Sequence, residues 1–195
     1  MHSLLNRNVY FVKQQLGLFK AERSYDIYDP ESKELILICR EKGLSFFTKL
    51  LRFTDMRLCT PFNVEILTPD GTPLVRVSRD WTFFMSKVKV FDESNQLIGS
   101  FKQQLFSFGG AFDVLDPADQ FLCKLQGKWT SWDFRFIAGD QEFAHVTKKW
   151  AGIGKELFTQ ADNYILEIND SVPEDNPLRQ LIMAAVMCID MVLKS

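Results

Sequence analysis

The sequence predicts a mainly β domain: a closed barrel of about twelve antiparallel strands around a buried C-terminal α-helix. Short runs of alternating polar and apolar residues recur in pairs, and turn-forming residues join each pair. The last segment of the chain is apolar on every side but shorter than a membrane span. With 195 residues, 46% of them hydrophobic, the chain can form one sizeable core, so we expect a single domain over residues 1–195.

The predicted strands fill residues 8–169, after a flexible segment of residues 1–7. A first strand covers residues 8–15, and a last strand covers residues 163–169. Between them, β-branched and aromatic residues at period two flank turns rich in Pro, Asp, Asn and Gly. The five hairpins that this pattern predicts are 25–39, 64–77, 88–101, 112–125 and 134–146.

The turns also indicate an internal repeat. Four turn aspartates are 22, 24 and 24 residues apart, namely Asp70, Asp92, Asp116 and Asp140. On a longer scale, Lys13-Gln-Gln-Leu16 precedes Tyr28-Asp-Pro30 much as Lys102-Gln-Gln-Leu105 precedes Leu115-Asp-Pro117. This echo is consistent with an ancient duplication.

Closing twelve strands into a barrel removes their exposed edges, but such a barrel is too wide for its own side chains to fill. The segment 176–194 is suited to fill it. Asn176 is a good N-cap, Pro177 fits the first helical position, and Asp190 is the only charge from Leu181 to Val192. The predicted core residues of this helix are Leu181, Ile182, Ala185, Val186 and Ile189. The alternative, a membrane span, needs about 20 apolar residues.

Residues 43–54 carry apolar side chains at helical spacing, which predicts a short amphipathic helix. It either packs against the barrel or lies on a membrane surface.

Composition and the spacing of reactive residues argue against several classes of function. The net charge of −2 argues against a nucleic-acid partner bound through a general basic field. The N-terminus has no apolar secretory signal. Four separated cysteines (Cys39, Cys59, Cys123 and Cys188) predict reduced thiols in an intracellular protein, with a disulfide or zinc site as the alternative. Neither histidine, His2 or His145, has a second metal ligand at a suitable spacing, and no catalytic triad is identifiable. We expect no enzyme activity, no cofactor and no small-molecule substrate.

The stretch from Lys148 to Tyr164, Lys-Lys-Trp-Ala-Gly-Ile-Gly-Lys-Glu-Leu-Phe-Thr-Gln-Ala-Asp-Asn-Tyr, closely resembles part of the phospholipid scramblase family. The tail with Ile189-Asp190 and the motif Tyr25-Asp-Ile-Tyr-Asp29 are similar in order and spacing. The resemblance covers most of the chain and is specific in its C-terminal third. It implies the tubby-like fold, a twelve-stranded barrel around a central helix, which the LURP-one-related proteins share.

The family is linked with calcium-dependent movement of lipids between leaflets, membrane tethering and transcriptional roles. The resemblance therefore implies a non-enzymatic protein at a membrane surface that binds phospholipid head groups or assists transbilayer phospholipid movement. We expect it to be cytoplasmic or peripheral at the inner face of a membrane. The candidate lipid-binding or anion-binding residues are Lys148, Lys149, Trp150 and Lys155, which otherwise form an ordinary solvated loop.

The alternative function is a soluble ligand-binding or protein-binding barrel without lipid activity. Its contacts would come from exposed members of two aromatic clusters, most of whose residues we expect in the core. The clusters comprise Trp81, Phe83, Phe84, Trp129 and Trp132.

The resemblance also invites a calcium site after Phe158-Thr159, and the residues discourage it. Of the alternating positions from Gln160 to Ile168, only Asp162 is a carboxylate, whereas calcium takes six to eight oxygens. The same residues fit a strand whose Tyr164, Leu166 and Ile168 face the helix. We expect no metal site. The weak calcium candidates are Asp162, Asp170 and Asp175.

Overall fold

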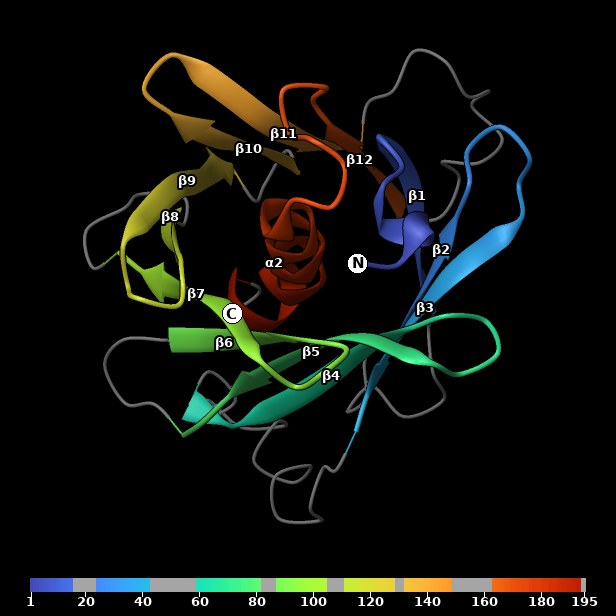
Figure 1. Ribbon diagram of the computed structural model, residues 1–195, viewed down its shortest axis with the longest axis horizontal. Helices are drawn as coiled ribbons and strands as arrows, with labels where there is room; N and C mark the ends of the chain where they lie inside the picture. The colour runs from blue at the N-terminus through green and yellow to red at the C-terminus, as the bar shows by residue number, and fades with distance from the viewer. Residues whose placement is uncertain are drawn as a thin grey trace.

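Twelve antiparallel strands close into one barrel around an α-helix in the computed structural model, as Figure 1 shows. The structure describes residues 1–15, 24–42, 59–81, 87–104, 111–128, 132–148 and 163–193, with the backbone alone for Cys188 and residues 190–193. Every strand pairs with its neighbours in sequence, and β1 pairs with β12 to close the ring. The predicted fold class is therefore confirmed. The predicted helix at 43–54 lies outside the described residues.

The strands follow the predicted hairpins closely. Their bounds are β1 Val9–Gln15, β2 Ser24–Tyr28, β3 Leu35–Glu41, β4 Phe62–Leu67, β5 Pro73–Arg79, β6 Lys87–Asp92, β7 Leu97–Gln103, β8 Ala111–Leu115, β9 Phe121–Lys128, β10 Asp133–Ala138, β11 Gln141–Thr147 and β12 Asn163–Ile168. The period of two explains the match, because alternate residues such as Phe62, Val64 and Ile66 of β4 are buried.

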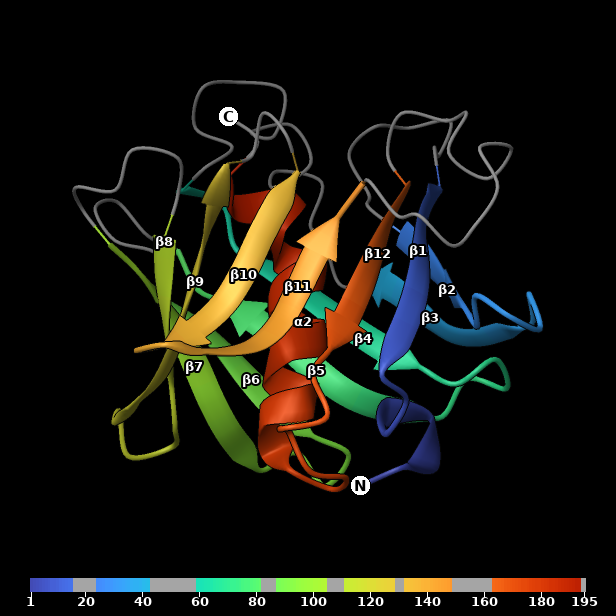
Figure 2. The same cartoon turned by 90° about the horizontal axis from the view of Figure 1, so that it is seen from above.

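The helix α2, Pro177–Leu193, runs through the barrel, as Figures 1 and 2 show. Asn176 caps it: its Oδ1 accepts a hydrogen bond from the backbone N–H of Leu178 at 2.9 Å. The predicted helix-core residues are all buried: Leu181, Ile182, Ala185, Val186 and Ile189. A Cβ at Gly99 of β7 would lie 2.9 Å from Leu181 Cδ2, so this glycine lets strand and helix approach closely.

In the described part of the chain, no helix is both long and apolar enough to cross a membrane. The side chain of Asp190, the only charge from Leu181 to Val192, is outside that part.

A buried arginine anchors the start of the helix. Arg179 is 3% exposed, and its guanidinium donates hydrogen bonds to the carbonyl oxygens of Val172, Pro173 and Arg7 and to Asn8 Oδ1, at 2.8–3.1 Å. It thereby ties three segments together: the N-terminus, the β12–α2 connection and the helix. Buried charge is tolerable here because several acceptors surround it.

The N-terminal segment differs from its prediction. We expected residues 1–7 to be flexible, whereas Ser3–Leu5 form a 3-10 helix and the Leu5 side chain is buried in the core. Tyr10 of β1 donates its hydroxyl proton to the Leu4 carbonyl oxygen at 3.1 Å. Burial raises the pKa of this tyrosine well above its usual value. Burial of Leu5 holds this segment on the barrel.

The long sequence echo corresponds to equivalent contacts half a barrel apart. Gln15, the second glutamine of the first Lys-Gln-Gln-Leu motif, donates to Asp26 of the next strand at 2.6 Å, and Gln104, the second glutamine of the other motif, donates to Asp113 at 2.7 Å. The lysines of the two motifs also pair in register with these same aspartates. Strands β1–β2 and β7–β8 thus repeat one arrangement, which supports the duplication.

The shorter repeat has a different register from the predicted one. Asp92 Oδ1 accepts from the backbone N–H groups of residues 94 and 96, and Asp116 Oδ1 accepts from those of residues 118 and 120. In the β4–β5 turn this acceptor is Thr68, whose Oγ1 takes the N–H of Thr72 at 3.0 Å. The repeating position is therefore 68, 92 and 116, and Asp70 lies two residues further on. A hydroxyl and a carboxylate perform the same turn-capping role, so counting aspartates misplaced the repeating position within this turn, although the hairpin itself lies where it was predicted.

Candidate functional site

The barrel has two chemically different ends. One end, called here the hairpin end, consists of residues 1–8 and the connections 29–34, 68–72, 92–96, 116–120, 139–140 and 169–176. It includes the start of α2, which lies low in Figure 2. The other end, called here the loop end, holds the remaining strand termini: residues 13–15, 24–26, 40–42, 59–63, 79–81, 87–89, 102–104, 111–113, 126–128, 132–133, 147–148 and 163.

The hairpin end is strongly acidic. Its six connections contain twelve acidic residues and a single basic residue, Lys33, while residues 1–8 add Arg7. The acids are Asp29, Glu31, Glu34, Asp70, Asp92, Glu93, Asp116, Asp119, Asp140, Asp170, Glu174 and Asp175. Because the whole chain carries only −2, the rest of it must be net positive. This end therefore carries a negative potential that repels anions.

The loop end is basic. Its described residues include nine bases, Lys13, Arg40, Lys42, Arg79, Lys87, Lys89, Lys102, Lys128 and Lys148, against five acids, Asp26, Glu41, Asp80, Asp113 and Asp133. Several of these bases already have partners. Arg79 donates to the Thr60 carbonyl oxygen at 2.6 Å, and Lys87 reaches Asp119 of the hairpin end at 2.6 Å. Arg40, Lys42 and Lys89 form ion pairs with Asp26, Glu65 and Asp80. Lys102 and Lys128 are exposed. The side chains of both lysines are therefore in contact with solvent at this end of the barrel.

Of the predicted anion-binding residues, the structure describes Lys148. Its ammonium lies 4.7 Å from the centroid of the Trp132 ring, a cation–π contact. Trp132 is buried and stacks on Tyr164 with ring centroids 5.3 Å apart. Lys148 is thus at the loop end, where aromatic packing fixes its position. Lys149, Trp150 and Lys155 lie outside the described residues.

The aromatic residues that were candidates for contact with a protein partner differ in their exposure to solvent. Trp81, just after β5 at the loop end, has 45% of its surface exposed, whereas Trp132 is part of the core. Trp132 adopts a positive φ of 49° and packs edge-on against Phe134, which buries its indole. Phe83, Phe84 and Trp129 are outside the described part of the chain.

Two of the weak calcium candidates hold the N-terminal segment. Asp170 accepts a hydrogen bond from Asn8 Nδ2, and Asp175 accepts one from Asn6 Nδ2 at 3.2 Å. Asp162 is outside the described residues, among which no group of three or more His, Cys, Asp or Glu gathers to hold a metal. Tyr164, Leu166 and Ile168 are buried in the core, as the strand reading predicted. Calcium independence stays a prediction.

The described cysteines are free thiols: Cys39 and Cys123 are buried, and Cys59 is half-buried. Burial raises the pKa of the Cys123 thiol to about 12, so that it stays protonated and unreactive near neutral pH. His145 contacts Asp133 Oδ1 through Nε2 at 2.9 Å, in a strand pair on the barrel wall.

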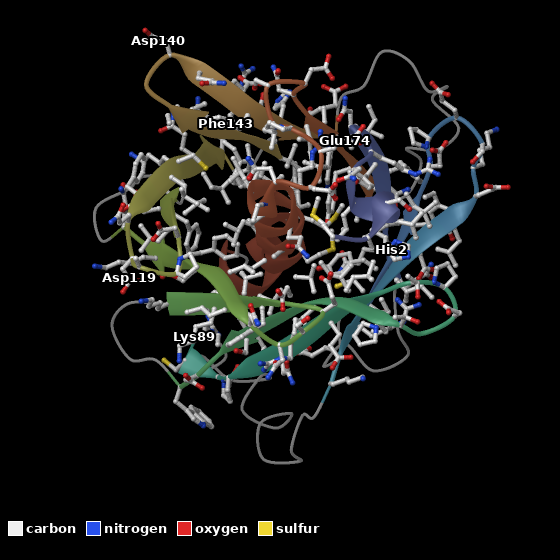
Figure 3. The ribbon with its side chains drawn as sticks, viewed as in Figure 1. His2, Lys89, Asp119, Asp140, Phe143 and Glu174 are labelled. Atoms are coloured by element: carbon white, nitrogen blue, oxygen red, sulfur yellow. The ribbon has the colours of Figure 1, made fainter. Side chains whose placement is uncertain are left out.

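Sequence reasoning missed one feature at the hairpin end, an apolar pocket of about 390 Å³. Leu97, Ile98, Leu122, Phe143, Leu178 and Leu181 line it, from β7, β9, β11 and α2. Figure 3 shows Phe143 between the barrel wall and α2, with Asp119 and Asp140 at the outer edge. Each strand contributes only one or two lining residues, so no local motif could reveal the pocket. The adjacent apolar residues Phe121 and Leu122, directly after a turn, were the only signal in the sequence.

Comparison with known proteins agrees with this geometry. The model of the Scramblase family matches residues 3–193. "Altered inheritance rate of mitochondria protein 25" of Saccharomyces cerevisiae is 22% identical over 96% of this chain. A phospholipid scramblase family protein of Schizosaccharomyces pombe is 22% identical over 93% of it. The chain spans 64% and 52% of these two proteins, so each contains more than this domain.

A solved structure of an Arabidopsis thaliana protein shares the fold. Its TM-score is 0.52 at 15% identity, and the match covers 95% of this chain and 91% of that one. This likeness supports the architecture and says nothing about activity. The family model, in contrast, covers nearly the whole chain and confirms the resemblance found in the sequence. The protein belongs to the Scramblase family.

Proposed function

We propose that this protein acts without catalysis at a membrane surface, where its loop end binds the head groups of anionic phospholipids. The separation of charge between the two barrel ends carries the proposal. Twelve acids gather in the connections of the hairpin end, while the loop end presents exposed lysines such as Lys102 and Lys128. An anionic leaflet attracts one end and repels the other, which orients the barrel before any specific contact forms.

The attraction between these lysines and an anionic membrane is strong enough for reversible binding. A basic residue near an anionic membrane contributes about 1 kcal/mol, so several lysines together give useful affinity at moderate salt. Trp81 adds an exposed indole at the same end, and tryptophan favours the boundary between head groups and acyl chains. Charge and an interfacial aromatic residue therefore support the same orientation.

Family membership supports a lipid-related role, and a relative is named as a phospholipid scramblase family protein. We extend the proposal to assistance of transbilayer phospholipid movement, for which head-group binding is the first step. The curated relatives are longer than this chain. Lipid movement is therefore proposed as an activity of a whole protein that contains this domain. Localisation at the inner, cytoplasmic face of a membrane follows from the same proposal, because anionic lipids concentrate there.

Vesicle flotation tests the proposal. The protein should float with vesicles of phosphatidylcholine and phosphatidylserine at low salt, float weakly with phosphatidylcholine alone, and dissociate as salt is raised. The double variant Lys102→Glu/Lys128→Glu should bind at least about 10-fold more weakly, because two attractive charges become repulsive.

Lys33→Glu is the matched control, since it makes the same kind of charge reversal on the exposed lysine of the hairpin end. It should leave binding unchanged. Equal losses in both variants would refute the orientation. Absence of binding to either vesicle at low salt would refute the membrane function and favour the soluble interaction module.

A further inference from the structure

The hairpin end contains an apolar pocket whose lining is partly open to solvent. Of the five large apolar side chains that are exposed in the described residues, Leu97 and Leu122 line this pocket, and Phe121 is the neighbour of Leu122. Their exposed fractions are 41%, 36% and 55%. Exposed apolar side chains that cluster beside a pocket, rather than scattering singly, indicate a binding surface.

The rim of the pocket is negatively charged. Asp116 lines it directly, and Asn176, which also lines it, follows Asp175 in the chain. Glu93 accepts a hydrogen bond from Gln180 of α2, the residue directly before the lining residue Leu181. Part of this charge is paired: the N-terminal ammonium of Met1 lies 3.9 Å from Glu93 Oε1 and 3.9 Å from Asp175 Oδ1, and Lys87 pairs with Asp119. Arg179 is buried among carbonyl groups.

We propose that this pocket binds a basic peptide segment of a protein partner, with an apolar side chain inserted between Leu97, Leu122 and Phe143 and with Lys or Arg residues against the acidic rim. Charge complementarity selects this occupant. An acidic rim disfavours fatty acids and anionic head groups, whereas it attracts a cationic segment and raises its rate of association. The volume of about 390 Å³ suits one anchoring group rather than an extended ligand.

This inference goes beyond the membrane function and does not depend on it. Together they describe a barrel whose loop end faces the lipid and whose hairpin end faces a partner protein. Either property can fail in experiment while the other holds, because they use opposite ends of the barrel.

Selection from a random peptide display library tests the proposal, with the intact protein as bait and its Leu122→Asp variant as the counter-selection. The enriched peptides should combine Lys or Arg with a Leu, Phe or Trp. No enrichment, or enriched peptides that are acidic or uncharged, would overturn the proposal.

Fluorescence anisotropy of one selected peptide then separates the two contributions. Leu122→Asp should weaken binding by about 10-fold or more, because it removes apolar contact area. The triple variant Glu93→Gln/Asp116→Asn/Asp175→Asn should weaken it by about 5–10-fold at low salt, since each exposed charge pair contributes little. Asn at 116 retains the acceptor that holds the turn.

Two matched variants control for folding and for the general field. Leu35→Asp changes another exposed leucine, on β3, and Glu31→Gln/Glu34→Gln/Asp70→Asn removes three hairpin-end charges from the β2–β3 and β4–β5 turns. Both should bind the peptide within about 2-fold of the parent protein. If the control triple weakens binding as much as the rim triple, the general field and not the pocket attracts the peptide, and the assignment fails.

The other occupants give distinct outcomes, each of which would also overturn the proposal. Displacement of the peptide by octanol, with no effect of the rim charges, would indicate an alkyl-chain site. Dimerisation in sedimentation velocity that Leu122→Asp abolishes would assign the surface to a second copy of this chain.

Discussion

The two ends of the barrel are built from the same strands yet differ in charge and in the way the chain is held. At the hairpin end, twelve acids surround turns whose hydrogen bonds are regular, and a buried arginine fixes the helix. At the loop end, lysines and an exposed tryptophan follow the strand termini. A net charge of −2 conceals this difference, because it is the sum of two opposite surfaces. Arguments about partners from net charge therefore need the topology first.

Part of the asymmetry comes from turn chemistry. Asp29, Asp92 and Asp116 accept backbone N–H bonds within their own turns, so folding alone explains those carboxylates. In contrast, Glu31, Glu34 and Glu174 are exposed, and an uncharged polar side chain would fit equally well at these positions. The acidic field thus exceeds what the turns require, which is consistent with a role in orientation.

The helix joins both ends, so its removal should have the largest effect. Truncation before Asn176 exposes the apolar lining of the barrel. At about 25 cal/mol per Å², losing several hundred Å² of buried apolar surface costs a free energy as large as a typical net stability of about 5–15 kcal/mol. The truncated protein should lose cooperative thermal unfolding in circular dichroism. A truncated protein with the parent's sheet spectrum and melting temperature would contradict the central role of the helix.

Thiol reactivity should distinguish the loop end from the barrel wall. The pKa of Cys123 is raised to about 12, so at pH 8 it is almost entirely the unreactive thiol. Cys59 precedes β4 at the loop end and is half-buried. Peptide mass spectrometry after brief alkylation at pH 8 should find Cys59 labelled about 100-fold faster than Cys123, because Cys123 is both buried and protonated. Similar rates would show that the wall opens readily.

Removing a positive charge should lower the free energy of unfolding far more at the start of the helix than at the loop end. Arg179→Gln leaves several buried carbonyl acceptors without donors, and we expect it to lower the free energy of unfolding by about 2–4 kcal/mol. Lys102→Gln at the loop end, a change of an exposed side chain, should change it by less than about 0.5 kcal/mol. Urea denaturation measures both values. Equal effects would mean that Arg179 does not anchor the helix.

The smallest expected effect is a small increase in stability. Lys33 has a φ of +59°, a left-handed conformation that side chains disfavour, in the β2–β3 turn. Lys33→Gly should raise the free energy of unfolding by up to about 1 kcal/mol. Lys42→Gly, directly after β3, serves as the comparison and should not stabilise the protein. A loss of stability in Lys33→Gly would mean that its side chain makes a favourable contact.

The sequence predicted the architecture because its signals are local. Alternation specifies each strand, Asp and Pro specify the turns, and the uniformly apolar run from Leu181 specifies the central helix. It did not predict features that depend on tertiary contact. The burial of Leu5, the use of Thr68 in place of an aspartate, and the separation of charge all require knowing which segments meet. The pocket is the extreme case, because its lining comes from four elements and the connections between them.

The orientation of the barrel on a membrane is the central claim, and site-specific fluorescence tests it directly. An environment-sensitive dye is attached either at Gln126→Cys near the loop end or at Ser94→Cys in the β6–β7 turn, each in a Cys59→Ser background. On addition of phosphatidylserine-containing vesicles, the dye at position 126 should shift to the blue, and the dye at position 94 should remain unchanged. A shift at position 94 alone, or equal shifts at both positions, would contradict the account.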